Sequence, residues 1–522
     1  MQTVSDGFHL AAQAGIRPHT WGFWASFPKN IDDSVEFGSW DSSTWDGGDL
    51  WTPGDDILFP IWNFYDYYNY SDRVVEMEWT REIDFPYSVS SAIADITLNN
   101  YDNFFTPEKG SPIDGFILPK RPIRLYAGLR GHETLQQMVG ITQGVPELDT
   151  KTKLATFNAL DFLSEMFSMP LTETVAMANV RTDEVLAELF QQFGLAPSQY
   201  ELATGRNKIP FLFFDRGKNA GNAFRDLMQA EGGHLWLDEQ GIIRFEQRLL
   251  PISDPVMEFN DSNVDEISGS GESELINTVR IRTDLREVQE FQAIWTSYTP
   301  DGTSQIAEPI IVPANGTKFF QIDLTDPLLT VSEPTLGQLS DDSWFTALNG
   351  ETPVNSDVSV SLGDLRNNNY VIMFENDNSF DVTIDKLQVW GEPAKLVDGN
   401  GLRYEAYDDV SVTKYGERVL EIDNNMFGSE SNAESFAETI LDAYAELNGV
   451  IEMSVKGDPS LQLGDIVEVD TRDFQGQYKV IKISNSMRDN RAKCTIKARR
   501  YEPRSWGFWD VSLWDDGYLW AP

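Results

Sequence analysis

The spacing of hydrophobic and polar positions first indicates β-structure in the N-terminal third of the chain. Residues 92–98 (AIADITL) alternate apolar side chains with small or polar ones, which is typical of a half-buried strand. Residues 73–79 alternate in part, and residues 123–128 form another short run of this type. These runs predict the hairpin elements of a first β-barrel, or of a sandwich, over residues 60–165.

The pattern becomes helical after residue 165. Behind Thr182, a residue type that caps helices, apolar side chains recur at helical spacing as far as Gly194. A second helical run ends at Gly232 and precedes a β-hairpin over residues 234–245. We therefore predict a small α/β domain over residues 166–250.

The next region reads as all-β. Residues 300–394 are rich in Asp, Asn, Ser, Thr and Gly and show no helical spacing. They contain four β-type runs, at residues 318–322, 358–362, 370–375 and 382–390. This composition predicts a β-sandwich inserted between flanking elements.

The clearest helical period covers residues 431–447, where Ser431 and Glu434 form a capping-box pattern. Strands are expected after it, at residues 451–455, 465–469, 478–483 and 494–498. The region comprising residues 251–299 and 395–500 is therefore predicted to be a second small barrel with the helix before it. The predicted fold class is mainly β with α/β parts, in several domains.

A repeat joins the two ends of the chain. Residues 40–53 (WDSSTWDGGDLWTP) and 509–522 (WDVSLWDDGYLWAP) are identical at nine positions, and residues 21–24 match 506–509. The Asp and Gly residues signal tight turns, and such short ribbons cannot bury large rings alone.

We therefore expect the Trp-rich segments 1–59 and 501–522 to dock onto another subunit, since Trp is a preferred interface anchor. Two other readings remain: the rings pack on their own domain, or they form a sugar-binding platform. The candidate interface residues are Trp21, Trp24, Trp40, Trp45, Trp51, Trp506, Trp509, Trp514 and Trp520.

The net charge of −43 limits the possible partners. Binding nucleic acid through its phosphates requires a surplus of Lys and Arg, which this chain lacks. An acidic chain is also repelled by an anionic membrane surface. The charge indicates either solubility alone or a conduit past which nucleic acid moves without adhering. No apolar run is long enough to span a bilayer, and the N-terminus does not read as a secretory signal.

The sequence offers no recognisable catalytic or metal-binding constellation. It has no nucleophile elbow, no zinc-protease motif and no phosphate-binding loop. Cys494 is the single cysteine and lies in a strand-like run. Acidic loop residues such as Asp46 and Asp515 do not have EF-hand spacing, so calcium is a minor alternative. We expect no catalytic residue, no metal and no cofactor.

One segment carries a resemblance to a known family. Residues 94–107 (ADITLNNYDNFFTP) resemble a signature of the minor tail proteins of long-tailed phages. Further matching elements lie in the same order at residues 121–125, 140–141, 220–245, 277–281, 387–393 and 464–467. The resemblance covers roughly residues 60–500 and depends on the order of the set, since no single element is specific.

The resemblance implies a baseplate-hub-like, tail-associated protein that works without catalysis at the virion tail tip, assembled in the host cytoplasm. It implies a homotrimer with two related barrels per chain, which together form a pseudo-sixfold ring. The implied partners are the distal tail or tail tube protein, the tape measure protein and tip or fibre proteins, with DNA passing through the channel unbound.

Two other function classes remain open. A carbohydrate-binding tail adhesin would act through the sandwich at residues 300–394 or through the Trp repeats. A cell-wall hydrolase is a third class, although no motif supports it.

Overall fold

The structure is a computed structural model of the whole chain, and it confirms the mainly β, multidomain fold class. The residues that it describes are 67–83, 87–107, 110–248, 254–269, 275–298, 309–337, 341–366, 369–397, 401–445, 449–488 and 491–501, with short pieces at 2, 4, 5, 8, 19–26, 37, 38, 50, 51, 506, 507, 519 and 520.

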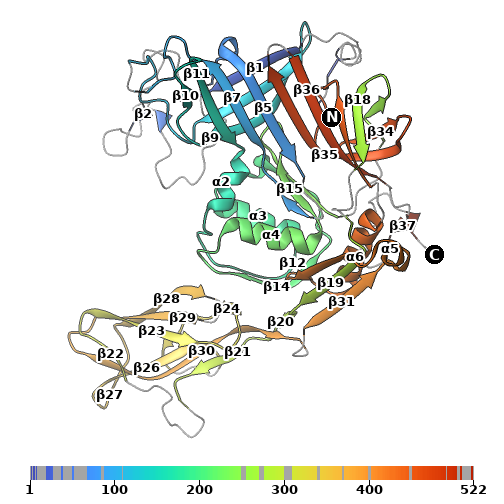
Figure 1. The fold of residues 1–522 in the computed structure, drawn as a ribbon. Coiled ribbons are helices and arrows are strands. Elements are labelled where there is room, and N and C mark those ends of the chain that lie inside the picture. The colour runs from blue at the N-terminus through green and yellow to red at the C-terminus, as the bar shows by residue number, and fades with distance from the viewer. Residues whose placement is uncertain are drawn as a thin grey trace.

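One sheet of fourteen strands forms the largest part of the molecule (Figure 1). Its strands are hydrogen-bonded in the order β18 (Val264–Gly269), β33 (Val450–Val455), β36 (Arg491–Arg500), β35 (Gln475–Arg488), β5 (Val74–Glu82), β7 (Ile93–Asn99), β11 (Leu154–Leu160), β9 (Thr134–Thr142), β8 (Pro122–Leu129), β1 (His19–Ala25) and β4 (Tyr68–Asn69). Outside this order, β10 (Glu147–Asp149) pairs with β11, and β34 (Ile466–Asp470) joins β17 (Met257–Asn260) to β35.

This sheet covers two hydrophobic cores. The first contains Phe23, Ile96, Leu125 and Phe157, and the second contains Ile451, Val467 and Ile496, with other side chains in each. The two halves join where β5 pairs antiparallel with β35, from Lys482 opposite Glu82 to Arg488 opposite Glu76. The sequence predicted two separate barrels. In the described residues they do not close, because β5 and β35 pair with each other and make one continuous sheet.

A helical unit lies below the large sheet and has its own core. Its helices are α2 (Phe162–Ser168), α3 (Thr182–Gln192) and α4 (Ala220–Glu231). Its strands are the ribbon β12 (Val175–Arg181) and β14 (Lys208–Phe214), and the sheet β13 (Tyr200–Leu202), β16 (Ile243–Glu246), β15 (His234–Leu237) and β6 (Ser88–Val89).

Thr182 was the predicted cap of α3, but it is the first helical residue, and Arg181 holds the N-cap position. The hydroxyl of Thr182 donates instead to the buried carboxylate of Glu231, 2.8 Å away. At the end of α4, Gly232 adopts the left-handed conformation, with φ of 67°. This glycine ends the helix as the sequence predicted.

A three-stranded sheet extends the same core. It contains β31 (Leu402–Tyr407), β19 (Thr278–Thr283) and β32 (Val419–Asp423), with α5 (Asp409–Tyr415) between β31 and β32. Helix α6 (Glu430–Tyr444) is the helix predicted at residues 431–447, and Phe436 and Ile440 bury its apolar face in the core of the helical unit. The predicted cap Ser431 lies inside the helix. Ser429 is the cap and accepts from the amide of Asn432 at 3.2 Å.

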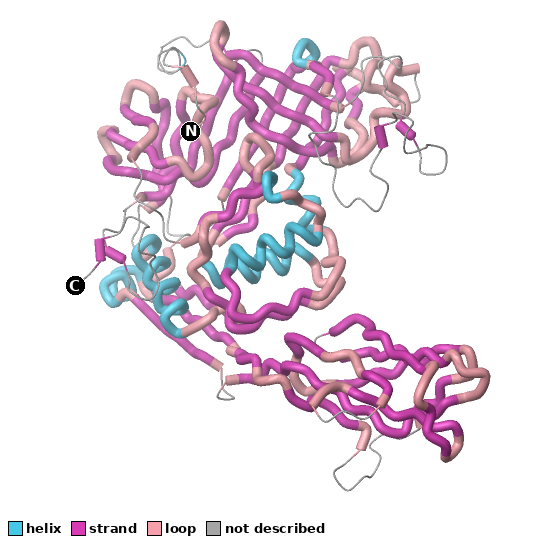
Figure 2. Tube along the Cα trace, turned by 180° about the vertical axis from the view of Figure 1, so that it is seen from behind, coloured by secondary structure: helices cyan, strands magenta, loops and turns pink. Residues whose placement is uncertain are grey.

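The inserted region is a two-sheet sandwich with a core of its own. Figures 1 and 2 show that it projects away from the large sheet, with α3 and α4 between them. One sheet is β23 (Gly316–Asp323), β29 (Asn369–Asn376) and β28 (Val358–Arg366). The other is centred on β30 (Val382–Leu396) and includes β20 (Arg286–Val288), β21 (Gln292–Thr296), β22 (Ile310–Val312), β24 (Leu328–Val331), β25 (Thr335–Leu336), β26 (Trp344–Asn349) and β27 (Thr352–Val354).

Candidate functional site

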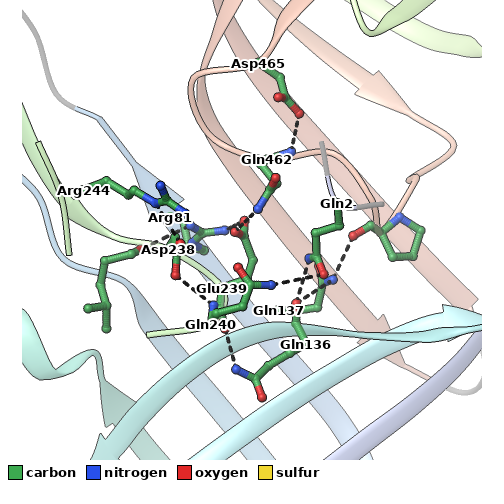
Figure 3. A network of polar contacts seen from close by, with 12 residues as sticks. Gln2, Arg81, Gln136, Gln137, Asp238, Glu239, Gln240, Arg244, Gln462 and Asp465 are labelled. Carbon is green, nitrogen blue, oxygen red and sulfur yellow. Dashed lines mark hydrogen bonds and ion pairs between the residues drawn. The ribbon is translucent and has the colours of Figure 1, made fainter. Parts of the chain in front are cut away.

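A buried polar junction connects the two halves of the large sheet to the helical unit (Figure 3). Arg81, on β5, forms an ion pair with Glu239, in the turn after β15, and also donates to the carbonyl of Leu237 at 3.2 Å. Gln462, which precedes β34, donates to the second carboxylate oxygen of Glu239 at 2.5 Å. The side chains of Arg81 and Glu239 are 6% and 2% exposed, so the charges neutralise each other away from water.

Strand β9 and the N-terminal residues reach the same junction. Gln136 donates to the carbonyl of Glu239 at 2.7 Å, and Gln137 donates to the carbonyl of Pro459 at 2.8 Å. Gln2 donates through its side chain to the carbonyl of Gln136 at 2.8 Å. Segments far apart in sequence are therefore held together by hydrogen bonds, and each bond adds roughly 1 kcal/mol.

Burial changes the pKa values around this junction. Burial lowers the pKa of Arg81 to about 10, although the negative charges of Asp238 and Asp161 act in the opposite direction. The guanidinium therefore stays charged at neutral pH. Burial raises the pKa of Asp161 to about 6, against hydrogen bonds from Ala92 and Ser164. Asp161 caps α2, and its carboxylate accepts from the amide of Ser164 at 3.1 Å.

A second polar seam lies between β15 and the large sheet. Lys479, on β35, is 1% exposed and forms an ion pair with Glu246, on β16. His234 shares a hydrogen bond of 3.1 Å with the hydroxyl of Ser88. Burial and the nearby cation of Lys479 lower the pKa of His234 well below its usual range, so the imidazole is neutral. Both seams are satisfied internally and bind the units of this chain to one another.

The described residues offer no metal cluster, since nowhere do three or more His, Cys, Asp or Glu side chains converge. The single cysteine, Cys494, is buried on β36, and burial raises the pKa of its thiol to about 12. That thiol is therefore protonated at neutral pH and is a poor nucleophile. Among the helices that the structure describes, none is both long and apolar enough to cross a membrane.

The outer face of the large sheet is divided by charge where its halves meet. On the β35–β36 side, Lys482 lies directly opposite Lys497, and exposed Arg488 and Lys493 extend the basic strip. On the β5–β7 side, exposed Glu78 lies directly opposite exposed Asp95. Where β5 meets β35, the hydroxyl of Thr80 contacts that of Ser484 at 3.0 Å. On either side of this contact the charges of the two strands pair, Lys482 with Glu82 at 2.8 Å and Arg488 with Glu76 at 3.7 Å. Sequence reasoning missed this surface because β5 and β35 are about four hundred residues apart.

Two of the predicted interface tryptophans lie in β1 of the large sheet. Trp21 is half-buried against the first core, and its ring meets that of Trp79 edge-on at 5.9 Å. Trp24 is also half-buried, with its ring 5.9 Å from that of Tyr126. These contacts within the chain favour own-domain packing for this pair.

The Trp repeat forms the same short ribbon in both copies. Phe37 and Gly38 (β2) pair parallel with Leu50 and Trp51 (β3), and Trp506 and Gly507 (β37) pair parallel with Leu519 and Trp520 (β38). The backbone of Trp51, Trp506 and Trp520 therefore has a strand conformation. The other candidates lie outside the described residues: Trp40, Trp45, Trp509 and Trp514.

Comparison with known proteins gives matches in structure alone. No family model matches the chain, and no curated protein sequence matches it. The structures that it resembles include tail proteins. The tail protein from Neisseria meningitidis MC58 is 9% identical, with a TM-score of 0.46, and the match covers 87% of this chain and 97% of that one.

Two prophage proteins give similar values. The 43 kDa tail protein of prophage MuSo2 from Shewanella oneidensis is 11% identical over 83% of this chain and 96% of that one, with a TM-score of 0.44. The prophage tail protein gp18 from Listeria monocytogenes EGD-e is 8% identical over 84% of this chain and 92% of that one, with a TM-score of 0.41. At these values the likeness does not assign a role to any residue.

Proposed function

We propose that this chain is a non-catalytic structural hub of a phage tail tip, which joins the tail tube to the tip complex and forms part of the DNA channel. The observation that carries the proposal is the single sheet across two cores, joined by the seven-residue pairing of β5 with β35. A chain of this kind supplies two sheet-and-core units in a fixed relation. Three chains would then supply six units, which is the ring implied by the sequence resemblance.

The buried junctions support a role in which rigidity matters. Arg81, Glu239 and Gln462 bind the two halves of the sheet and the helical unit to one another. An assembly hub has to hold its neighbours at fixed positions, whereas an enzyme needs reactive groups in reach of a substrate. The ionised groups at these junctions are instead buried and paired.

Deletion of the encoding gene from the phage tests the proposal. We expect lysates without complete tails and restored tails when the chain is supplied in trans, as judged by negative-stain electron microscopy. Infectious particles of normal appearance without the chain would contradict it. The trimer is tested separately, because light scattering of purified protein should give three times the 59.0 kDa chain mass.

The Trp repeats are proposed to carry docking specificity at the two ends. Replacing Trp45 or Trp514 with Ala should reduce particle assembly while leaving the yield of soluble subunit near wild type. Trp79→Ala is the matched control, because Trp79 is 3% exposed in the first core and its loss should reduce soluble yield itself. Insoluble repeat variants would show that these rings are core residues.

A further inference from the structure

The outer face of one sandwich sheet carries a group of aromatic rings that the proposed hub function does not use. They come from β30, from β26, and from the segment around β21. Four rings are not members of the sandwich core, which lies on the opposite side of this sheet: Trp390, Trp344, Tyr298 and Phe291. Trp344 is itself buried, at 2% exposure, whereas Trp390 and Tyr298 are half-buried and Phe291 is exposed. The core-facing neighbours on the same strands are Val389 and Phe345, among others.

The rings form two pairs across the sheet. Phe291 and Trp390 have ring centroids 5.8 Å apart, tilted by 34°, and Phe291 is 41% exposed. Tyr298 and Trp344 have centroids 6.1 Å apart, tilted by 39°. The register places Ala293 opposite Trp390 and Trp344 opposite Gln388, which brings both pairs to the same face.

Polar groups surround these rings. The hydroxyl of Tyr298 donates to the side-chain oxygen of Gln388 at 3.0 Å, and the ammonium of Lys386 lies 5.7 Å from the centre of the Tyr298 ring. On the other side of β30, Thr330 donates to the carboxylate of Glu392 at 2.6 Å. Donors and acceptors therefore alternate with flat apolar surfaces.

Three polar atoms of this face lack partners. Among the described residues, the indole nitrogens of Trp344 and Trp390 and the hydroxyl of Thr346 are buried without a hydrogen bond. Thr346 lies opposite Lys386 in the register, so all three atoms belong to the same face of β26 and β30. These atoms have almost no exposed surface, so Trp390 can offer a ligand the flat side of its ring but not its N–H group.

We propose that this face, centred on Trp390, binds a neutral saccharide. The rings of Trp390, Tyr298 and Phe291 give a sugar a flat apolar surface for its C–H groups, and Gln388 and Lys386 give partners for its hydroxyls. Charge restricts the class of sugar. Residues 300–394 hold fifteen Asp or Glu and three Lys or Arg, so an anionic polymer such as a uronate or a phosphodiester chain is repelled.

The test uses the purified full-length chain on an array of neutral hexose and N-acetylhexosamine oligosaccharides, with anionic glycans on the same array. We expect retention by at least one neutral glycan and none by the anionic ones. The affinity for the retained glycan is then measured by titration calorimetry. Trp390→Ala should weaken it about tenfold or more, and Trp390→Phe, which keeps a ring and loses the N–H, should weaken it by less.

Phe319→Ala is the matched control. Phe319 is 63% exposed on β23, in the other sheet of the sandwich, so its loss removes an exposed ring and leaves the proposed site intact. Its affinity should equal that of the wild type, and circular dichroism should show that all three variants are folded. Retention of anionic glycans alone, no retention at all, or equal affinity of Trp390→Ala and Phe319→Ala would each overturn the proposal. None of these results bears on tail assembly.

Discussion

At the scale of single residues, the Arg81–Glu239 pair is where one substitution should have the largest effect. Removing one partner of a buried ion pair leaves an uncompensated charge, at a cost of about 3–5 kcal/mol. We therefore expect Arg81→Leu to destabilise the fold by about that amount in urea unfolding, and hydrogen exchange to speed up at residues 237–240. Glu76→Ala is the control, because its partner Arg488 is 71% exposed at 3.7 Å, and it should cost under about 1 kcal/mol. Equal effects of the two variants would show that the junction is not a stabilising contact.

Asp161 should make stability depend on pH in an uncommon direction. Burial raises its pKa from 3.8 to about 6, so the folded state binds a proton more tightly than the unfolded state does. Its contribution is therefore present at low pH and is lost as the pH rises from about 4 to about 6. Asp161→Asn keeps a capping side chain on α2 and removes the ionisation. The variant should gain stability over wild type across this window, by up to roughly 3 kcal/mol in urea unfolding. A constant difference between the two proteins at every pH would contradict this.

At the scale of elements, Gly232 controls how α4 meets α6. It has φ of 67°, and a Cβ placed there would lie 2.9 Å from the Phe436 ring. Gly194 also has a positive φ, of 75°, but an added Cβ meets nothing within 4 Å. Both Ala variants strain the backbone, by about 1–2 kcal/mol. Only Gly232→Ala should add an overpacking cost of about 1–3 kcal/mol in urea unfolding. If the two variants are equally destabilised, the close packing of α4 on α6 does not limit stability.

Local pattern predicted most of these elements but not their partners. The helix before Gly194, the hairpin after Gly232 and four sandwich strands follow from spacing and turn residues. The sequence predicts Ser431 as the cap of α6, whereas the cap is Ser429. Both are good capping residues, and only the direction of the backbone distinguishes them. The ribbon strand β14 was missed, since its sequence KIPFLFF has no alternation. The pairing of β5 with β35 forms the charge-divided face and the polar junction. It cannot be predicted from local sequence, because the two strands are far apart along the chain.

At the scale of the whole molecule, the distribution of charge bears on the proposed DNA channel. The net charge of −43 favours a conduit from which DNA is repelled, yet the outer face of the large sheet is mixed. Lys482, Lys497, Lys493 and Arg488 form a basic strip on this face, and Glu82 pairs with Lys482 at 2.8 Å. Basic side chains confined to one strip beside carboxylates should not hold DNA in a chain this acidic. We therefore expect no mobility shift of double-stranded DNA by the wild-type protein, even at low salt.

Reversing the acidic strip should change that behaviour. Glu78 and Asp95 are exposed and directly opposite each other, so Glu78→Lys combined with Asp95→Lys makes the face basic from β36 to β7. Because phosphate contacts release counterions, the variant should retain DNA at 50 mM salt and lose it at higher salt, with an affinity that falls steeply with salt concentration. The matched control places the same two charges on the sandwich, as Glu351→Lys with Glu375→Lys, two exposed positions away from the large sheet, which gives equal net charge. Retention by both variants would mean that total charge alone governs the interaction. Retention by the first variant alone would mean that the paired carboxylates of β5 and β7 keep this face from holding DNA.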